Sequence, residues 1–249
     1  DEDGRGCALL LDVLSGHDPR DWSALATPPT DSAAAAIADV RDLSDVRIGY
    51  SADLGFGSND PGVQANTDRV VSVLEQLGAT VEKVDLEWDD PAWAYHIIWY
   101  AGAEVVVRAL GPAAEEKVDP LLLEALERHR DLTAGDLVSA NALRMEMGTS
   151  MGLFHEEFDV LVAPSMPGVA FEAGRTVPEG GSASPDWTSW TPYTYPFNLT
   201  GQPAVTVPSG FVDGLPTGAQ FVAARHRDTT VLRVAAAYEA AAGFTMLGG

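Results

Sequence analysis

The stretch WTPYTYPFNLTGQPAVTVPSGFVDGLPTGAQFVA, from Trp190 to Ala223, decides the fold. It holds two short apolar runs, Ala204–Pro208 and Ala219–Ala223, separated by a cluster of glycine, proline and aspartate residues. Because the first run contains three adjacent β-branched residues, it suits a pleated and buried surface. The pattern predicts two strands joined by a tight, glycine-rich connection. A helix capped by Asp228 is expected to follow over about Thr229–Ala242.

The segment between Val46 and Leu86 has the pattern of a strand, a helix and a second strand. Val46–Tyr50 is a candidate first strand, Pro61 is suited to the first position of a helix, and Gly78 is suited to its end. Thr80–Leu86 alternates as a second strand does. A unit of this length predicts a parallel pair of strands. Further upstream, Cys7–Leu14 is apolar on nearly every side and predicts a buried helix.

The segment from residue 91 to residue 163 predicts two more helices and another strand. Pro91–Leu110 is an aromatic-rich helix, and Thr133 with Asp136 three residues later forms a capping-box pattern. The helix that this box opens keeps an apolar stripe as far as Phe158, and the apolar run Val160–Ala163 follows as a short buried strand. The whole pattern indicates an α/β fold with helices on both sides of a sheet.

Composition limits the classes of function. The 249 residues are 46% hydrophobic, which is enough for one large domain or two small ones, and no apolar run reaches the ~20 residues that cross a bilayer. The net charge is −22 with only two lysines, Lys83 and Lys117, which argues against a nucleic-acid partner. Cys7 is the only cysteine, so an internal disulfide or cysteine zinc cluster is excluded and a cytoplasmic location is expected. The acidity indicates a strongly solvated surface or adaptation to a salt-rich interior.

Three quoted segments carry a resemblance to a known family. They are LFHEEFDVLVAPSMPGVAFEAG (153–174), FNLTGQPAVTVPSG (197–210) and GLPTGAQ (214–220). Together with the flanking elements, they resemble the amidase-signature hydrolases, which cleave amides with a serine–serine–lysine triad. The resemblance covers most of the chain. It implies part of the amidase-signature fold, a mixed β-sheet flanked by helices, and it implies no cofactor and no metal.

The catalytic triad of that family has no counterpart in these 249 residues, so we expect no catalytic residue in this chain. The stretch LLLDVLSGHDPRD (9–21) resembles a segment that follows the family's nucleophile loop. Residues 1–249 are therefore expected to be the C-terminal portion of a single domain, with the N-terminal catalytic segment not in this sequence. We expect this chain alone to be inactive and not to remain a soluble monomer. Its expected partners are the missing segment or a partner chain, and a second copy in a homodimer.

The resemblance implies the chemistry and the site. A neutral lysine takes a proton through a bridging serine from the nucleophile, which attacks the amide carbonyl and forms an acyl-serine. The products are an acid plus ammonia or an amine. A small-molecule amide is expected to contact Trp190, Thr191, Tyr193, Phe197 and Asn198, although aromatics this dense can also simply pack a long loop. The resemblance also implies that five residues shape the sheet and the turn under the substrate site: Asn198, Gly201, Pro203, Pro208 and Gln220.

Two alternatives remain open. The chain can be a truncated, non-catalytic homologue that acts as a binding or regulatory partner. It can also be an unrelated hydrolase that uses Ser182, in the run GGSAS, or His96. The substrate is open as well, because the family acts on aliphatic, aryl and fatty-acid amides and on glutamine for tRNA-linked transamidation. The negative charge argues against the last of these.

Overall fold

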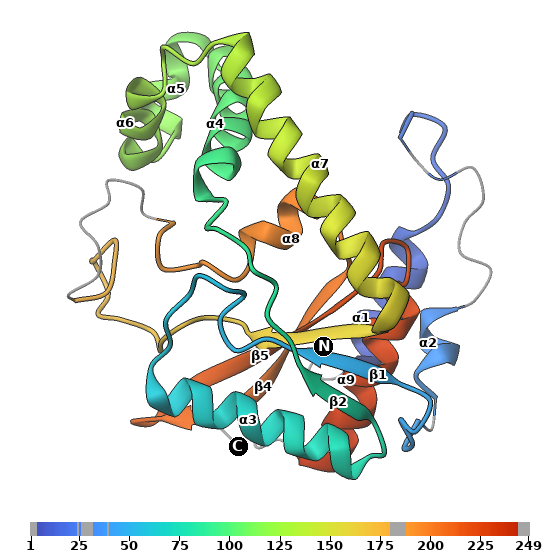
Figure 1. Cartoon of the computed structure of the whole chain (residues 1–249). Helices are drawn as coiled ribbons and strands as arrows, with labels where there is room; N and C mark the ends of the chain where they lie inside the picture. The colour runs from blue at the N-terminus through green and yellow to red at the C-terminus, as the bar shows by residue number, and fades with distance from the viewer. Residues whose placement is uncertain (1–3, 24, 26–31, 39, 180–187, 244–249) are drawn as a thin grey trace.

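A five-stranded mixed sheet forms the centre of the chain (Figure 1). The computed structural model describes residues 4–23, 25, 32–38, 40–179 and 188–243. The strands lie in the order β2-β1-β3-β5-β4. Their bounds are β1 (Arg47–Tyr50), β2 (Thr80–Lys83), β3 (Val160–Pro164), β4 (Ala204–Val212) and β5 (Leu215–Ala223). β1 is parallel to both β2 and β3, whereas β5 is antiparallel to both β3 and β4.

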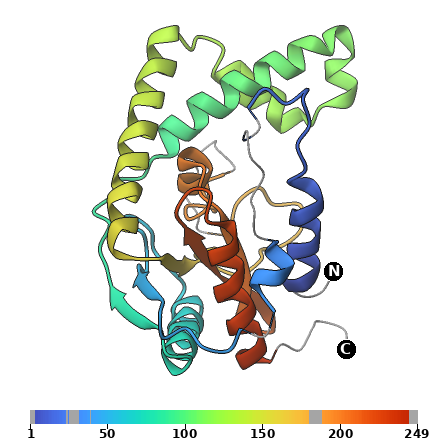
Figure 2. The same cartoon turned by 90° about the vertical axis from the view of Figure 1, so that its right-hand side faces the viewer.

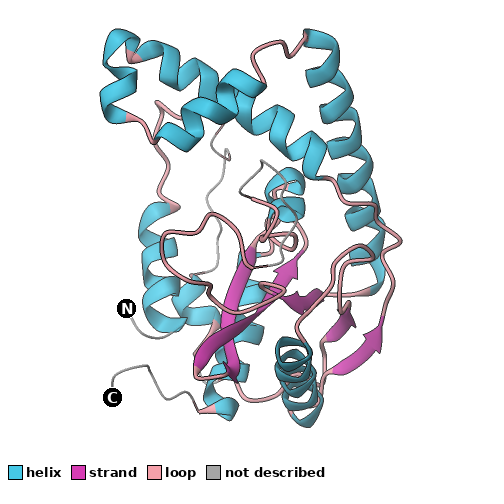
Figure 3. Cartoon of the chain, turned by 90° about the vertical axis from the view of Figure 1, so that its left-hand side faces the viewer, coloured by secondary structure: helices cyan, strands magenta, loops and turns pink. Residues whose placement is uncertain are grey.

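Helices cover both faces of this sheet (Figures 1 and 3). Those that pack on the strands are α3 (Pro61–Gln76), α9 (Asp228–Ala242), α7 (Ala134–Glu157) and α8 (Tyr195–Thr200). Those that extend away from the sheet are α4 (Ala92–Ala109), η1 (Gly111–Ala113), α5 (Ala114–Lys117) and α6 (Pro120–Arg128). At the side of the molecule, α1 (Gly4–Leu14) and α2 (Ala33–Ala36) lie beside α9 (Figure 2). The predicted α/β class, a mixed sheet flanked by helices, is confirmed.

The core on the two faces of the sheet forms two clusters, because side chains alternate across the strands. Val160, Val162 and Phe221 pack in the cluster that holds α3 and α9. Leu161 and Val222 pack in the cluster that holds residues of α7 and α8. All five residues of β3 are buried, so this strand is covered on both faces, as strands in the middle of an α/β sheet are.

The hairpin predicted from the central stretch is confirmed, but its connection is shorter than expected. β4 and β5 are nine residues each, and only Asp213 and Gly214 separate them. Both have positive φ, 50° and 79°, which is the type I′ geometry that matches the twist of a hairpin. Pro216 and Gly218 therefore lie within β5, and a register irregularity occurs near Gly210 in β4.

The predicted strand–helix–strand unit and the long capped helix are also confirmed. α3 begins at Pro61 after Asp60, whose carboxylate accepts a hydrogen bond from Gly62 N at 2.7 Å. At the start of α7, the Thr133 hydroxyl accepts from Asp136 N at 3.2 Å, and Thr133 N donates to the Asp136 carboxylate at 2.8 Å. This reciprocal pair satisfies two amides that the first turn of a helix otherwise leaves open.

Two predictions about helices were wrong, and several short helices, including α2 and α8, were not predicted. The helix over Cys7–Leu14 forms, but Leu10 and Val13 are 58% and 76% exposed, because Ala8 is the side chain that faces the α2–α9 cluster. The cap of α9 is Arg227, and Asp228 occupies the first turn instead. α8 was missed because its six residues include a proline and are too few to show a helical period.

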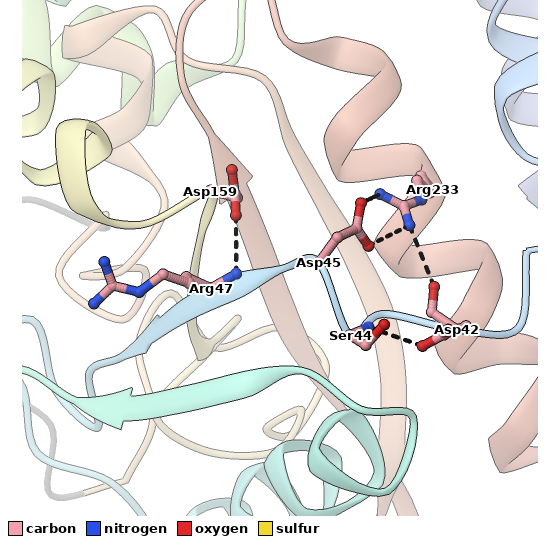
Figure 4. Close-up of polar contacts among 6 residues, drawn as sticks. All are labelled: Asp42, Ser44, Asp45, Arg47, Asp159 and Arg233. Carbon is pink, nitrogen blue, oxygen red and sulfur yellow. Dashed lines mark hydrogen bonds and ion pairs between the residues drawn. The ribbon is translucent and has the colours of Figure 1, made fainter.

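A polar cluster joins α9 to the entry of β1 (Figure 4). The guanidinium of Arg233 donates to both carboxylate oxygens of Asp45, at 2.9 and 2.7 Å, and to the Asp42 carbonyl at 3.2 Å. The hydrogen bond from Arg233 lowers the pKa of the Asp45 carboxyl. Arg47 N donates to the Asp159 carboxylate at 2.8 Å, one residue before β3. Because the side chain of Asp45 is largely exposed, the pair orients α9 more than it stabilises the fold.

None of the helices in the described ranges combines the length and the apolar character that a membrane crossing requires.

Phe221 provides a test of the core. Its side chain is fully buried and contacts Tyr238 of α9 edge to face, with ring centroids 5.9 Å apart. Phe221→Ala should lower the free energy of unfolding by about 3–5 kcal/mol, because it removes buried area and leaves a cavity. Urea denaturation measures the change. Phe211→Ala is the matched control, since Phe211 lies in the same hairpin but is 49% exposed and should cost less than about 1 kcal/mol.

His155 joins the end of α7 to the entry of β4. Its Nδ1 lies 2.9 Å from the Phe158 carbonyl and donates to it, because a carbonyl can only accept. Its Nε2 therefore accepts from the Gln202 side-chain amide at 2.8 Å. Burial lowers the pKa of His155, and the Phe158 hydrogen bond opposes that shift.

His155 should make stability fall as the pH falls below about 6.5, the ordinary pKa of histidine. Below that pH the unfolded chain binds a proton at this histidine more readily than the folded chain does, so protonation stabilises the unfolded state. The free energy of unfolding then falls by at most about 1.4 kcal/mol per pH unit for one proton. Urea midpoints between pH 7.5 and 5.5 should decline less steeply in His155→Gln. His17→Gln, in an exposed turn, is the control and should keep the wild-type slope; equal slopes in all three proteins would contradict the prediction.

Candidate functional site

A cavity of about 200 Å³ lies beyond the carboxyl end of β3. β3 ends at Pro164, and because β5 runs antiparallel to it, the beginning of β5 lies at the same edge of the sheet. Crevices outside the carboxyl ends of strands are the usual ligand sites of α/β sheets. The lining residues are Met166, Gly168, Val169, Ala170, Phe171, Trp190, Pro216, Thr217 and Gly218.

Two aromatic rings form one wall of the cavity. Phe171 and Trp190 meet edge to face, with centroids 5.4 Å apart and ring planes at 81°. Another part of the lining is the beginning of β5, where Gly218 allows a close approach to Ser165 and Thr206. Among the described residues, none that lines the cavity carries a charge.

The hydroxyl groups near the cavity already have protein partners. Thr217 Oγ1 accepts from Asn66 Nδ2 at 2.7 Å and lies 2.8 Å from Ser209 Oγ. Ser165 Oγ donates to Thr206 Oγ1 at 3.1 Å. These bonds tie β3, β4, β5 and α3 together below the cavity, so the site has a fixed floor.

The segment that carries Trp190 is anchored through Tyr193, which is fully buried. The phenol of Tyr193 donates to Asn59 Oδ1 at 2.7 Å, and its main-chain carbonyl accepts from Gln220 Nε2 at 2.6 Å. Gln220 belongs to β5, and Asn59 follows β1 and donates to the Ala52 carbonyl at 2.7 Å. Burial raises the pKa of Tyr193, so the phenol keeps the proton that this anchor needs.

A second anchor joins the same segment to α4. His96 is buried, and its Nε2 lies 2.5 Å from Thr188 Oγ1. Its ring also stacks on Tyr100, with centroids 5.6 Å apart. These contacts give His96 a structural role in holding the Trp190 segment. Ser182, the other candidate nucleophile or base from the sequence, lies outside the described residues.

The five predicted substrate contacts lie in different environments. Trp190 lines the cavity, whereas Thr191 donates through its hydroxyl to the Thr188 carbonyl at 2.8 Å. Tyr193 and Phe197 are buried in the core cluster above β3, and Asn198 is exposed on α8. The structure therefore brings one of the five side chains to the cavity wall and buries two others in the core.

The supporting residues predicted around the hairpin are spread over three kinds of element. Asn198 lies on α8, Gly201 and Pro203 lie between α8 and β4, and Pro208 and Gln220 lie in β4 and β5. Gly201 ends α8 in the left-handed region with φ 67°, and Gln220 joins the Pro164 and Tyr193 carbonyls. Sequence reasoning missed the cavity lining at Met166–Phe171 and Pro216–Gly218. A signal was present, since Met166 comes three residues after the end of the predicted buried strand Val160–Ala163, where ligand loops commonly begin.

No cluster of histidine, cysteine, aspartate or glutamate that could hold a metal ion occurs in the described part of the chain.

Comparison with known proteins gives a consistent picture. A model of the Amidase family matches residues 5–232. An acylamidase from Rhodococcus erythropolis is 34% identical over 239 residues, covering 94% of this chain and 49% of that protein. A Glutamyl-tRNA(Gln) amidotransferase subunit from Chloroflexus aggregans is 30% identical over 256 residues, covering 93% of this chain and 51% of that protein.

A solved structure extends the comparison to the fold. The crystal structure of a bacterial aryl acylamidase belonging to the amidase signature enzymes superposes with a TM-score of 0.79 at 25% identity, over 96% of this chain and 51% of that one. The chain thus spans about half the length of the curated relatives it matches.

Gly57 tests the Tyr193 anchor. A Cβ at this position would collide with the Tyr193 phenol, so Gly57→Ala should displace the ring and weaken its bond to Asn59. We expect a loss of about 1–3 kcal/mol in the free energy of unfolding, from the clash and the disturbed buried hydrogen bond. Urea denaturation is the measurement, and Gly168→Ala is the control because nothing lies within 4 Å of its Cβ position. Equal stability of the two variants would contradict the anchor.

Proposed function

The chain belongs to the amidase signature family, and from this premise we propose that it is the C-terminal portion of an amidase. The whole protein hydrolyses a carboxylic amide to an acid plus ammonia or an amine through an acyl-serine intermediate. The observation that carries the proposal is the family match over residues 5–232. The similarity to an acylamidase supports it, since that relative acts in the same class of reaction by its name.

The serine–serine–lysine triad is proposed to lie outside residues 1–249. A lysine that accepts a proton near neutral pH needs a desolvated position that disfavours its charged form. Lys83 ends the edge strand β2 and Lys117 ends α5, and both are exposed. This chain spans about half the length of its relatives, which leaves room for the triad in the other half. Residues 1–249 alone are then inactive.

Exposed apolar side chains support a further segment of the same domain. Leu9, Leu10, Val13 and Leu14 of α1 are each more than half exposed, although the helix is strongly apolar. Contiguous apolar surface of this kind on a soluble protein marks a site of contact with other protein. We propose that the segment with the triad covers α1 and completes a single domain.

Residues 1–249 contribute to substrate binding. We propose that Trp190 contacts the amide and that Tyr193, through its bonds to Asn59 and Gln220, anchors the segment that carries Trp190. Direct substrate contact by Thr191, by Asn198 and by Phe197, which packs in the core, stays a prediction from the family resemblance. The fixed floor and anchored aromatic wall mean that the site loses little conformational entropy when a substrate binds.

A non-catalytic role is the second candidate. It is favoured by the exposed positions of both lysines and by a relative whose name makes it one component of an amidotransferase. In this reading the chain binds another protein or a second copy through its apolar surface. A cytoplasmic location is proposed for either candidate, supported by the single cysteine.

Two measurements separate the candidates. The intact mass of the natural polypeptide should be about twice the 26.3 kDa of these residues, since the relatives are about twice as long. That polypeptide should release ammonia from at least one of acetamide, benzamide and glutamine, whereas purified residues 1–249 should release none. Amide hydrolysis by residues 1–249 alone would contradict the proposed position of the triad. A natural polypeptide of 26.3 kDa without activity would favour the non-catalytic role.

The exposed face of α1 gives a prediction about association. Residues 1–249 should elute from size-exclusion chromatography as aggregates or oligomers, and Leu10→Glu with Val13→Glu should shift them toward a monomer because charges oppose apolar contact. The control is Val105→Glu with Val106→Glu, which adds the same charges to α4 at similarly exposed positions. Monodisperse elution of the unmodified chain would count against a covering segment at α1.

A further inference from the structure

We propose that the cavity beside Trp190 receives an uncharged aromatic or branched aliphatic group of the substrate. The protein then selects aryl and branched alkyl amides and discriminates against glutamine. This inference rests on the proposed amide hydrolysis and adds the chemical class of the substrate.

The lining is mostly apolar and has no charged side chain among the described residues to pair with a charged ligand group. The apolar side chains are those of Met166, Val169, Phe171, Trp190 and Pro216. The ammonium and carboxylate groups of glutamine would lose water there without gaining a partner, which is a large penalty. An aromatic or branched alkyl group loses only apolar contact with water, which is favourable.

The hydroxyl groups at the floor of the cavity, on Thr217 and Ser165, already have hydrogen-bond partners within the protein. Thr217 already accepts from Asn66, and Ser165 already donates to Thr206. A site that selects a polar group presents donors or acceptors that stay unpaired until that group binds, and this produces its discrimination. In this cavity Thr217 and Ser165 bond to other protein groups, so selection of the substrate depends on the shape of the cavity and on apolar contact.

The size of the cavity fits one ring. Its volume is about 200 Å³, and apolar cavities of roughly 150 Å³ accept benzene. Phe171 and Trp190 stand at 81° to each other, so an entering ring can contact one edge and one face. Gly168 is one of the lining residues, and nothing lies within 4 Å of where its Cβ would stand, so a side chain added there would meet no protein atom.

Hydrogen bonds within the protein fix both wall segments of the cavity in the absence of a ligand. The loop after β3 is tied to the start of α3 by a hydrogen bond from Asp60 N to the Pro167 carbonyl at 2.7 Å. The Trp190 segment is tied to β5 through Gln220 and the Tyr193 carbonyl. One wall is therefore tied to α3 and the other to β5, and the shape that they define can act as a filter for substrates.

The test fills the cavity from Gly168. Gly168→Leu in the natural polypeptide places a branched side chain into the open space, and the φ of Gly168 lies outside the left-handed region, so the backbone tolerates it. Gly152→Leu is the matched control, because Gly152 is an exposed glycine of α7 with equally open surroundings. Ligand-observed NMR measures the Kd of benzamide, isobutyramide and glutamine, and ammonia release measures kcat/KM for the same amides and for acetamide.

The expected result is a weakening of benzamide binding by about tenfold or more in Gly168→Leu and by less than about twofold in Gly152→Leu. The value of kcat/KM for benzamide should fall in parallel, while that for acetamide changes by less than about threefold. Glutamine should bind more weakly than benzamide in the wild type. Trp190→Ala is the second variant, should Gly168→Leu not fold, and should weaken benzamide binding through loss of the aromatic wall.

The two proposals fail in different ways. Equal benzamide affinity in the wild type and a folded Gly168→Leu variant would overturn the cavity assignment, even with amide hydrolysis intact. Glutamine binding tighter than benzamide would overturn it as well. Benzamide binding that is sensitive to Gly168→Leu, in a protein that hydrolyses no amide, would support the cavity and overturn the proposed reaction.

Discussion

The antiparallel pairing of β3 with β5 is the interaction on which the rest of the structure depends. It joins the parallel part of the sheet, β2-β1-β3, to the hairpin of β4 and β5. All five residues of β3 are buried, so its backbone groups must find their partners within the sheet. The register sets Pro164 opposite Ala219, and this brings the end of one strand and the beginning of the other to the same edge, where the cavity lies.

The same pairing fixes the wall of the cavity. Gln220 lies beside Ala163 in the register, and its amide reaches the Tyr193 carbonyl at 2.6 Å. Because Gln220 is buried and Tyr193 is fully buried, breaking this bond would leave polar groups without water. The position of Trp190 is thus a consequence of strand pairing far along the chain. An aromatic wall held this way keeps a fixed shape before any ligand binds.

Much of the fold could be predicted from local patterns. The capping box at Thr133, the proline at the start of α3 and the Asp213–Gly214 turn each act over a few residues, and their physical causes are visible in the sequence. The burial of α1 could not be predicted in this way. An apolar helix is expected to be covered, yet whether a covering surface exists depends on other segments, and Leu10 and Val13 are exposed.

The sequence by itself determined the strands, the main helices, the mixed α/β class and the family resemblance, because these depend on side-chain periodicity and on quoted runs of residues. It also pointed to the segment around Trp190. Only the tertiary structure decided which side chains meet at the cavity, because Met166–Phe171, Trp190 and Pro216–Gly218 are brought together by strand pairing rather than by closeness in the chain. The direction of each side chain decided which of the predicted site residues are buried and which are exposed. Phe197 turns into the core while Asn198, the next residue, faces solvent, since adjacent residues of a helix point to different sides.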